Sequence, residues 1–313
     1  MPLAPAAEAD LTGDSPDLSD QVSDTPGIGR RRVRPGAAVW AWLRSDRRAA
    51  VAVGYLVVLV VASILAPLFT RDPLEQDLES MLAKPGGKHW LGTDDLGRDV
   101  LSRLVAGAQV SLRAAGTAVL VATLLGITVG VLAGFLGGLV DDVVMRLTDA
   151  ALAFPALVLA IGVVAMLGPG LNNAMAAVGI VFAPAVARLA RSQVLKVKET
   201  LYVDASHTFG ASNWQIIRRD ILPNAMPAIV VQLAMLFSVA LLAEAGLSFI
   251  GLGVQPPDPS WGSMLGRAYK FMDKAPQQIV IVGLVIMTAA IAFNTVGDSL
   301  RDHLDPRRRR GRA

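Results

Sequence analysis

Few residues of this 313-residue chain have the types and spacing that chemistry requires. The absence of cysteine excludes disulfides, thiolate metal sites and cysteine nucleophiles. His89, Asp94, Asp95 and Asp99 lie close together in sequence, but their spacing matches neither an EF-hand nor a zinc pattern, so no metal site is predicted. No G-x-x-x-x-G-K-[ST] loop occurs, so the chain does not bind and split ATP by that route.

One acidic residue stands apart from the others. Glu244 has apolar sequence from Ile221 to Ala243 before it and from Ala245 to Val254 after it. An acid between such flanks indicates a functional position that faces a cavity or a basic partner, here a candidate pore or gate residue. The alternative is that a helix ends there and Glu244 lies at the membrane interface.

Residues 188–220 form a long basic segment that keeps apolar residues at helical spacing. Val203, Ser206 and Gly210 recur at steps of three or four on one predicted helix, and Trp214 begins a second. Ser212 is the predicted N-cap between the two helices. A short helix-turn-helix of this kind is typical of a docking surface for a soluble partner, or of an amphipathic helix lying on the bilayer. Pro223 is expected in the first turn of the helix that follows.

The elements that position these residues are apolar helices. The chain is 53% hydrophobic and 18% charged, with a mean hydropathy of +0.50, whereas soluble domains carry about 25% charged residues. About 20 apolar residues cross a bilayer as a helix. We therefore predict an all-α polytopic membrane protein with six transmembrane helices. The predicted spans are residues 49–69, 114–140, 150–167, 170–187, 221–243 and 275–297.

The basic residues orient these spans. With both termini inside, 20 of the 29 Lys and Arg residues lie on cytoplasmic segments, which satisfies the positive-inside rule. The low net charge of +3 argues against nucleic acid as a partner. We predict a disordered cytoplasmic tail over residues 1–40, a transmembrane domain over residues 41–305 and a basic cytoplasmic tail over residues 306–313.

Small residues fall every fourth position along the second predicted span. The stripe predicts close packing, because helices in lipid associate where small side chains let their backbones approach. Either a neighbouring helix or a second subunit could pack there. Its members are Ala114, Ala118, Ala122, Gly126, Gly130, Gly134 and Gly138.

Several motifs together resemble the permease subunits of bacterial ABC importers. Asp204-Ala205-Ser206, then Gly210, then Ile221-Leu222-Pro223 is similar to the EAA loop of that family. Three further segments resemble the C-type permease of the dipeptide, oligopeptide and nickel group, and the likeness runs from about residue 40 to 305. They are Leu91–Asp99 (with Gly92, Asp94, Gly97, Arg98 and Asp99), Gly107–Leu112, and Ala243–Gly253 followed by Pro256-Pro257 and Trp261-Gly262.

The EAA-like loop departs from the family pattern at three positions. Asp204 replaces a glutamate, Ser206 replaces an alanine, and Asp220 stands where the family has an isoleucine. The acidic charge and the glycine are retained, so docking is still expected.

The resemblance implies a type I ABC importer permease fold with a cytoplasmic coupling helix, and no catalytic activity or cofactor of the chain's own. It implies a heterodimeric pore with a B-type permease in the plasma membrane. Two ABC ATPase subunits, or one fused ATPase, would bind ATP and Mg²⁺, and an extracytoplasmic binding protein would deliver di- or oligopeptides for transport by alternating access. The segment from Phe69 to Arg113, which carries the Leu91–Asp99 motif, and the loop from Gly246 to Lys274 are the expected contacts on the outer face.

Three alternatives remain open from sequence. The imported solute could be a nickel chelate, glutathione or another small molecule. A secondary transporter would need no ATPase, but Glu244 alone is a poor basis for ion coupling. A non-transporting membrane anchor would explain the docking loop but not the glycine-rich spans with their prolines.

Overall fold

A computed structural model describes residues 35–304, and those residues are helical apart from the segment 70–99 and shorter connections. The chain divides into two units after Ala41, and the account below concerns the second unit. Besides the helices there is a 3₁₀ turn, Leu78–Ser80, and a π-helical turn, Ile217–Ile221. The helices are α1 (Pro35–Ser45), α2 (Arg47–Phe69), α3 (Val100–Leu136), α4 (Gly138–Leu152), α5 (Ala156–Leu167), α6 (Leu171–Lys198), α7 (Leu201–Thr208), α8 (Asn213–Ile216), α9 (Leu222–Phe249), α10 (Trp261–Lys270) and α11 (Pro276–Leu304).

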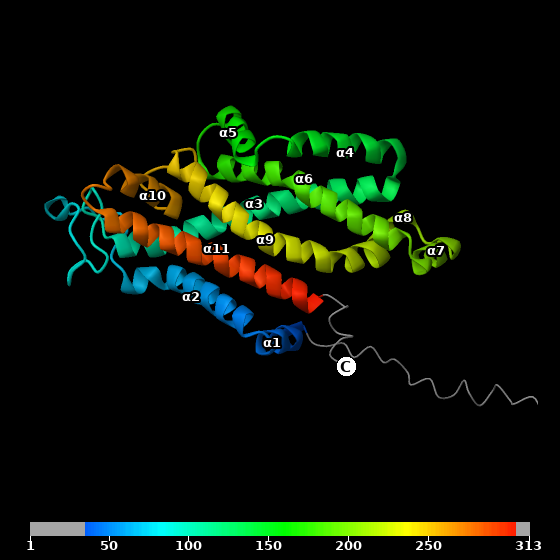
Figure 1. The fold of residues 1–313 in the computed structure, drawn as a ribbon, viewed down its shortest axis with the longest axis horizontal. Helices are drawn as coiled ribbons and strands as arrows, with labels where there is room; N and C mark the ends of the chain where they lie inside the picture. The colour runs from blue at the N-terminus through cyan, green and yellow to red at the C-terminus, as the bar shows by residue number, and fades with distance from the viewer. Residues whose placement is uncertain (1–34, 305–313) are drawn as a thin grey trace, which may run out of the picture. The chain divides into compact units, whose positions relative to one another are not determined.

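Five helical segments of the described residues are long and apolar enough to cross a membrane, and a bent pair brings the number to six. The five are α2, α3, α6, the run from α8 through α9, and α11. The bent pair is α4 and α5, which meet at 97°. Figure 1 shows α2, α3, α6, α9 and α11 running alongside one another, with the two halves of the bent pair beside α6.

The third predicted span, residues 150–167, is therefore wrong as a straight helix. The helix breaks at residues 153–155, where Pro155 precedes α5 and lacks the N–H that a continuing helix needs. With 12 residues, α5 is about 18 Å long, which is too short to cross a hydrocarbon core of about 30 Å. Gly168-Pro169-Gly170 does make the predicted tight turn between α5 and α6.

Several other predicted helix ends are shifted. Helix α3 begins at Val100 rather than residue 114, α6 continues from residue 187 to Lys198, and α11 continues from residue 297 to Leu304. The fifth span begins at Asn213 and ends at Phe249. Residues 35–40, which were predicted to be disordered, are helical; the rest of that tail and residues 306–313 lie outside the described residues.

The small-residue stripe of α3 packs against α6. A methyl group added at Gly130 would lie 2.3 Å from the carbonyl oxygen of Ala187, and one at Gly126 would lie 2.6 Å from the Cβ of Val186. The contact is reciprocal, because a methyl group at Gly179 of α6 would lie 2.5 Å from the Cβ of Val121. The neighbour of the stripe is thus a helix of the same chain, and we call this contact the α3–α6 seam.

Gly138 does not belong to the seam. Helix α3 ends at Leu136, and Gly137 and Gly138 follow with φ of +68° and +56°, a left-handed conformation that glycine adopts without a Cβ penalty. The pair turns the chain from α3 into α4, so the four-residue period stops at Gly134.

Candidate functional site

The EAA-like segment, residues 199–223, joins α6 to α9. Its helix α7 is held by one buried side chain, Val203, which belongs to a cluster with Val194 of α6, Phe135 of α3 and Ile216 of α8. The Nζ of Lys198 donates to the carbonyl oxygen of Phe135 at 2.8 Å, which ties the C-terminal ends of α3 and α6 together. The segment is therefore anchored on the end of the α3–α6 seam.

The other face of α7 is exposed and presents large apolar side chains among polar ones. Leu201 and Phe209 are 87% and 89% exposed, and Tyr202 and Asp204 are exposed beside them. Ala205 is also exposed, and the hydroxyl of Ser206 donates to the carbonyl oxygen of Tyr202 at 3.0 Å. The serine at position 206, where the family has alanine, therefore does not disturb a buried contact. Large apolar side chains on a short connecting helix favour a partner surface.

Gly210 ends α7 in a Schellman motif. Its φ is +79°, its N–H donates to the carbonyl oxygen of His207 at 3.0 Å, and the N–H of Ala211 donates to that of Ser206 at 3.0 Å. A methyl group at Gly210 would meet nothing within 4 Å. The glycine therefore serves the backbone conformation, and within this chain it does not make room for a close neighbour.

The second half of the segment starts at the predicted N-cap. Ser212 and Gln215 form a capping box, in which each side chain accepts from the other residue's backbone N–H. Trp214 is 66% exposed, whereas Ile216 is fully buried.

Pro223 lies in the first turn of α9, as expected, but no break separates that helix from α8. A π-helical turn at Ile217–Ile221 connects α8 directly to α9, and the N–H of Leu222 donates to the carbonyl oxygen of Ile217. The side-chain amide of Asn224 donates to the carbonyl oxygen of Asp220 at 2.6 Å, which satisfies one carbonyl near the proline. Ile221 is fully buried and Leu222 is partly buried against the same cluster as Val203.

At the opposite end of α3, residues 70–99 form a folded cap built on a buried ion cluster. The carboxylate of Asp94 accepts from the Nε of Arg98 at 2.8 Å and from the backbone N–H groups of Leu96 and Arg98. The Nε of Arg103 lies 3.5 Å from the same carboxylate, and its Nη1 donates to the carbonyl oxygen of Pro73 at 2.9 Å. Arg98 and Arg103 are 2% and 4% exposed, so the cap is ordered by paired buried charge.

Two glycines of the cap sit where another residue cannot. Gly92 and Gly97 have φ of +81° and +72°. A methyl group at Gly92 would lie 2.4 Å from the carbonyl oxygen of Ala83, and one at Gly97 would lie 1.8 Å from that of Asp77. The backbone conformation and the close approach both require glycine.

Asp99 connects the cap to α3. It is the N-cap of α3 and accepts from the N–H and hydroxyl of Ser102 at 2.9 and 2.8 Å, and the Nδ1 of His89 lies 2.9 Å from its Oδ1. Burial opposes ionisation, yet the contacts from Ser102 and His89 hold the pKa of the Asp99 carboxyl below its usual value. No group of three or more His, Asp or Glu side chains suited to a metal ion occurs within residues 35–304.

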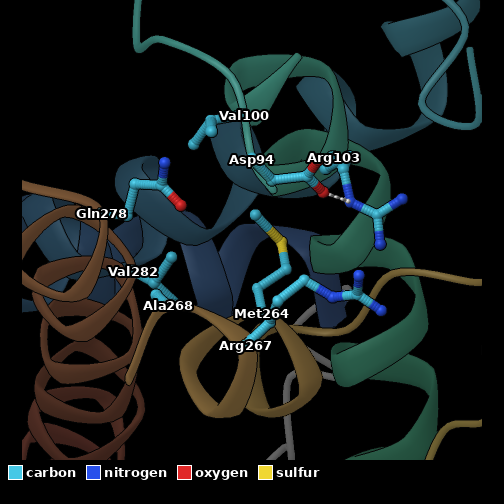
Figure 2. Close-up of a pocket in the computed structure, with 8 residues that line it drawn as sticks. All are labelled: Asp94, Val100, Arg103, Met264, Arg267, Ala268, Gln278 and Val282. Atoms are coloured by element: carbon cyan, nitrogen blue, oxygen red, sulfur yellow. Dashed lines mark ion pairs between the residues drawn. The ribbon is translucent and has the colours of Figure 1, made fainter. Parts of the chain in front are cut away.

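The cap is joined to α10 and α11, as Figure 2 shows for the side chains around a small cavity of about 10 Å³. The Nε2 of Gln278 on α11 donates to the carbonyl oxygen of Thr93 at 2.7 Å. The Nη1 of Arg267 on α10 lies 3.2 Å from both carboxylate oxygens of Asp95. Gln278 and Arg267 were not expected in the site, because nothing in one sequence pairs them with a segment 172 or more residues away.

Glu244 lies inside the chain. It is 0% exposed, one turn before the end of α9, and its Oε1 accepts from the hydroxyl of Ser248 at 2.7 Å. Ser111 of α3 and Ser260, the N-cap of α10, are its other polar neighbours. A cavity or a basic partner was expected; the polar neighbours named here are serine hydroxyls. The helix continues for five residues beyond Glu244, so this residue is not an interfacial helix end. A pore or gate role for Glu244 stays a prediction.

Two ion pairs that sequence reasoning missed hold α4 against α6. Arg191 contacts both carboxylate oxygens of Asp141, and the Nη2 of Arg188 lies 2.5 Å from the Oδ1 of Asp149. The charges explain why α6 runs past its apolar stretch, since the arginines pair with acids of another helix.

Comparison with known proteins identifies the family. Residues 126–310 match the model of the "binding-protein-dependent transport system inner membrane component" family. The chain is 39% identical to the dipeptide transport system permease protein DppC of Alkalihalophilus pseudofirmus, over 88% of this chain and 91% of the relative. It is 41% identical to the glutathione transport system permease protein GsiD of Pectobacterium atrosepticum, over 85% and 90% of the two chains.

A solved structure shares the fold. A chain of the MetNI methionine ABC transporter in an inward-facing conformation superposes with a TM-score of 0.55, covering 65% of this chain and 97% of that chain at 20% identity. The all-α permease fold predicted from sequence is confirmed. The protein is a multi-pass membrane protein that belongs to the family of binding-protein-dependent ABC importer permeases.

Proposed function

We propose that this chain is the pore-forming permease subunit of an ATP-driven importer that moves small peptides across the bacterial plasma membrane by alternating access. The single observation that carries the proposal is helix α7, a short helix that exposes large apolar side chains and is anchored on the end of the α3–α6 seam. The names of the dipeptide and glutathione permeases it resembles support peptides as the substrate class.

Helix α7 is the surface that would dock an ATPase. Its exposed Leu201 and Phe209 would enter an apolar groove on that partner, and Asp204 would supply the acidic charge beside them. Since no phosphate loop exists in the sequence, ATP and Mg²⁺ would be bound by two ATPase subunits or one fused ATPase. The chain itself would be non-catalytic and without a cofactor of its own.

The orientation of the chain in the membrane determines where the remaining partners would bind. The bias of basic residues supports an orientation with both termini in the cytoplasm, which puts α7 inside and the cap outside. A B-type permease would complete the pore, and an extracytoplasmic binding protein would deliver substrate to the cap and α10. Exposed apolar residues along α4 and α5, such as Leu147 and Met166, favour burial against such a subunit or lipid.

Copurification tests the docking surface. A tagged chain coexpressed with the ATPases encoded beside it should retain them, and Phe209→Asp combined with Leu201→Asp should lose them. Lys196→Gln is the matched control, because Lys196 is also exposed near this end of α6 but lies outside α7. The double variant Gly210→Trp with Asp204→Lys should also lose the ATPases. Retained binding and transport in both double variants would refute the assignment.

Uptake into proteoliposomes tests the substrate class. The full complex with its binding protein should accumulate labelled dipeptide only when ATP is inside with the ATPases. Competition by dipeptides, by glutathione and by a nickel chelate then ranks the alternatives. Accumulation of a nickel chelate without competition by any peptide would replace peptide import with metal-chelate import. Uptake driven by an ion gradient without ATP would indicate a secondary transporter.

A further inference from the structure

Glu244 is a buried carboxylate that the transport scheme does not use. It is 0% exposed, so in this conformation it has no surface with which to contact a solute. The hydroxyl of Ser248, one turn further along α9, donates to its Oε1 at 2.7 Å, whereas its Oε2 is buried without a hydrogen-bond partner. The hydroxyls of Ser111 on α3 and Ser260 at the start of α10 lie beside the carboxylate. Since a carboxylate accepts about four hydrogen bonds and is costly to bury without them, Glu244 favours a fixed arrangement of these serines.

Each of the three serines is also tied to a backbone N–H group of residues 254–263, which lead from α9 into α10. A serine hydroxyl can accept one hydrogen bond while it donates its single proton to another group. Each serine can therefore link a backbone N–H group of those residues to the carboxylate. The links are Val254 N–H to Ser248 at 3.3 Å, Trp261 N–H to Ser111 at 3.1 Å, and Ser263 N–H to Ser260 at 3.2 Å.

Helix α10 is close-packed against the helices that Glu244 joins. Trp261, its first residue, is 1% exposed, and its Nε1 donates to the carbonyl oxygen of Leu104 on α3 at 2.9 Å. A methyl group at Gly262 would lie 2.5 Å from the carbonyl oxygen of Ala245 on α9. These contacts depend on the orientation of α10, because a small rotation of that helix would separate Trp261 from α3 or press Gly262 into α9.

Helix α10 also contacts the cap. The Nη1 of Arg267 lies 3.2 Å from both carboxylate oxygens of Asp95. Arg267 is about 9 Å along the helix from Trp261, so a tilt of α10 at its first residue would displace this pair. The orientation that is set at the start of α10 therefore determines where Arg267 meets the cap.

We propose that Glu244 is a positioning residue, a carboxylate hub that fixes α10 on α3 and α9 through three serine hydroxyls. The hub would align α10, and with it the cap, on the helices that span the membrane. The consequence for transport rests on the proposed function: substrate would be delivered to an outer surface whose position Glu244 sets, without contact between Glu244 and the substrate.

Distances between spin labels test the hub. The chain has no cysteine, so introduced cysteines carry the only labels on it. Lys270→Cys on α10 with Leu120→Cys on α3 reports the position of α10, and Leu120→Cys with Met287→Cys on α11 reports the rest of the bundle; all three side chains are exposed. The distances are measured by pulsed electron paramagnetic resonance on the complete complex in nanodiscs, with cysteine-free partner subunits.

Variants then remove the acceptor or one of its donors. Glu244→Leu removes both carboxylate oxygens and Ser111→Ala removes one link, and each should raise the fraction of displaced α10 about tenfold. Glu244→Gln keeps an acceptor for Ser248 and should keep the wild-type distance. Ser238→Ala is the matched control, because Ser238 is also buried but donates to the carbonyl oxygen of Ala290 on α11 at 3.0 Å, so both label pairs should be unchanged.

The outcomes decide the hub independently of the proposed function. A second distance between Lys270 and Leu120 in Glu244→Leu and Ser111→Ala, with the distance between Leu120 and Met287 unchanged, would support the hub even in a system that imports no peptide. If Glu244→Leu does not assemble, Ser111→Ala alone decides. The wild-type distance in both variants would overturn the hub, and so would equal displacement in Glu244→Gln or a change in both label pairs. Peptide uptake by the wild-type system, measured separately, would then still stand.

Discussion

Replacement of Gly130 by alanine measures how tightly the α3–α6 seam is packed. The new methyl group would lie 2.3 Å from the carbonyl oxygen of Ala187 and 2.8 Å from the Cβ of Ala190. A backbone oxygen cannot rotate away as a flexible side chain can, so the two helices must separate. Gly283 of α11 provides the control, because it is also within a spanning helix and a methyl group there would meet nothing within 4 Å.

The two substitutions should change stability in opposite directions. Alanine is a better helix former than glycine by about 1 kcal/mol, and Gly283→Ala should gain up to this amount. Gly130→Ala gains the same term but overpacks a close contact, which costs about 1–3 kcal/mol, and the 2.3 Å approach favours the upper end. A net loss of about 2 kcal/mol corresponds to a factor of about 30 in the unfolding equilibrium.

Unfolding in SDS titrations, followed by circular dichroism in mixed micelles, gives this difference directly. The seam also predicts an order: Gly134→Ala should cost less than Gly130→Ala, because its methyl group would lie 3.1 Å from the side chain of Val194 and 3.2 Å from the carbonyl oxygen of Arg191, both longer than the 2.3 Å at Gly130. If Gly130→Ala proves as stable as Gly283→Ala, the seam is not close-packed and the reasoning fails.

Three further perturbations address the cap and α7. Asp94→Asn leaves two buried arginines without their carboxylate and should destabilise the protein by about 3–5 kcal/mol in the same titration, whereas Asp95→Asn, at a partly exposed pair, should cost less than about 1 kcal/mol. The pKa of the Asp99 carboxyl is lowered in the folded protein, so its contribution to stability is fully present above the unfolded-state pKa of about 3.9 and is lost as the pH falls through the folded-state pKa. The thermal unfolding midpoint should therefore decrease when the pH is lowered below about 4, and it should decrease less steeply in Asp99→Asn. Gly210→Ala should strain the left-handed position by about 1–2 kcal/mol and weaken ATPase copurification, and Gly210→Asn, which tolerates that conformation better, should weaken it less.

Sequence patterns predicted the apolar core of each helix but not its ends. The charge-free run that predicts this span begins after Arg113, yet α3 extends back to Val100 because Asp99 caps it and Arg103 is paired with Asp94. Similarly, α6 continues through Arg188 and Arg191, which pair with acids of α4. An arginine neutralised by a distant carboxylate does not end a helix, and one sequence does not reveal the partner.

In the candidate site, too, the sequence predicted local features but not contacts between distant segments. Local signals were sufficient at Ser212, the predicted N-cap. The environment of Glu244 depends on Ser111 and Ser260, which come from two other helices. Its burial was therefore beyond what apolar flanks could indicate.

The packing of α3 and α6 determines how motion at α7 could reach the cap. Helix α3 has 37 residues and is about 55 Å long, with Asp99 of the cap at its start and Phe135 of the α7 cluster near its end. Where methyl-sized changes already clash, two helices do not slide independently. A force on α7 would thus move α3, α6 and the cap together.

The bent pair of α4 and α5 is the element outside the seam that is best suited to flexing. Helix α4 is bounded by the Gly137-Gly138 turn and by the break at residues 153–155, and ion pairs join its side chains to α6. Glycines and a proline-bounded bend absorb changes of φ and ψ more readily than a packed helix interior does. Alternating access in this chain would therefore combine a rigid α3–α6–α7 body with a hinged α4–α5 pair, and a seam that yields before that hinge does would contradict the close approaches at Gly126 and Gly130.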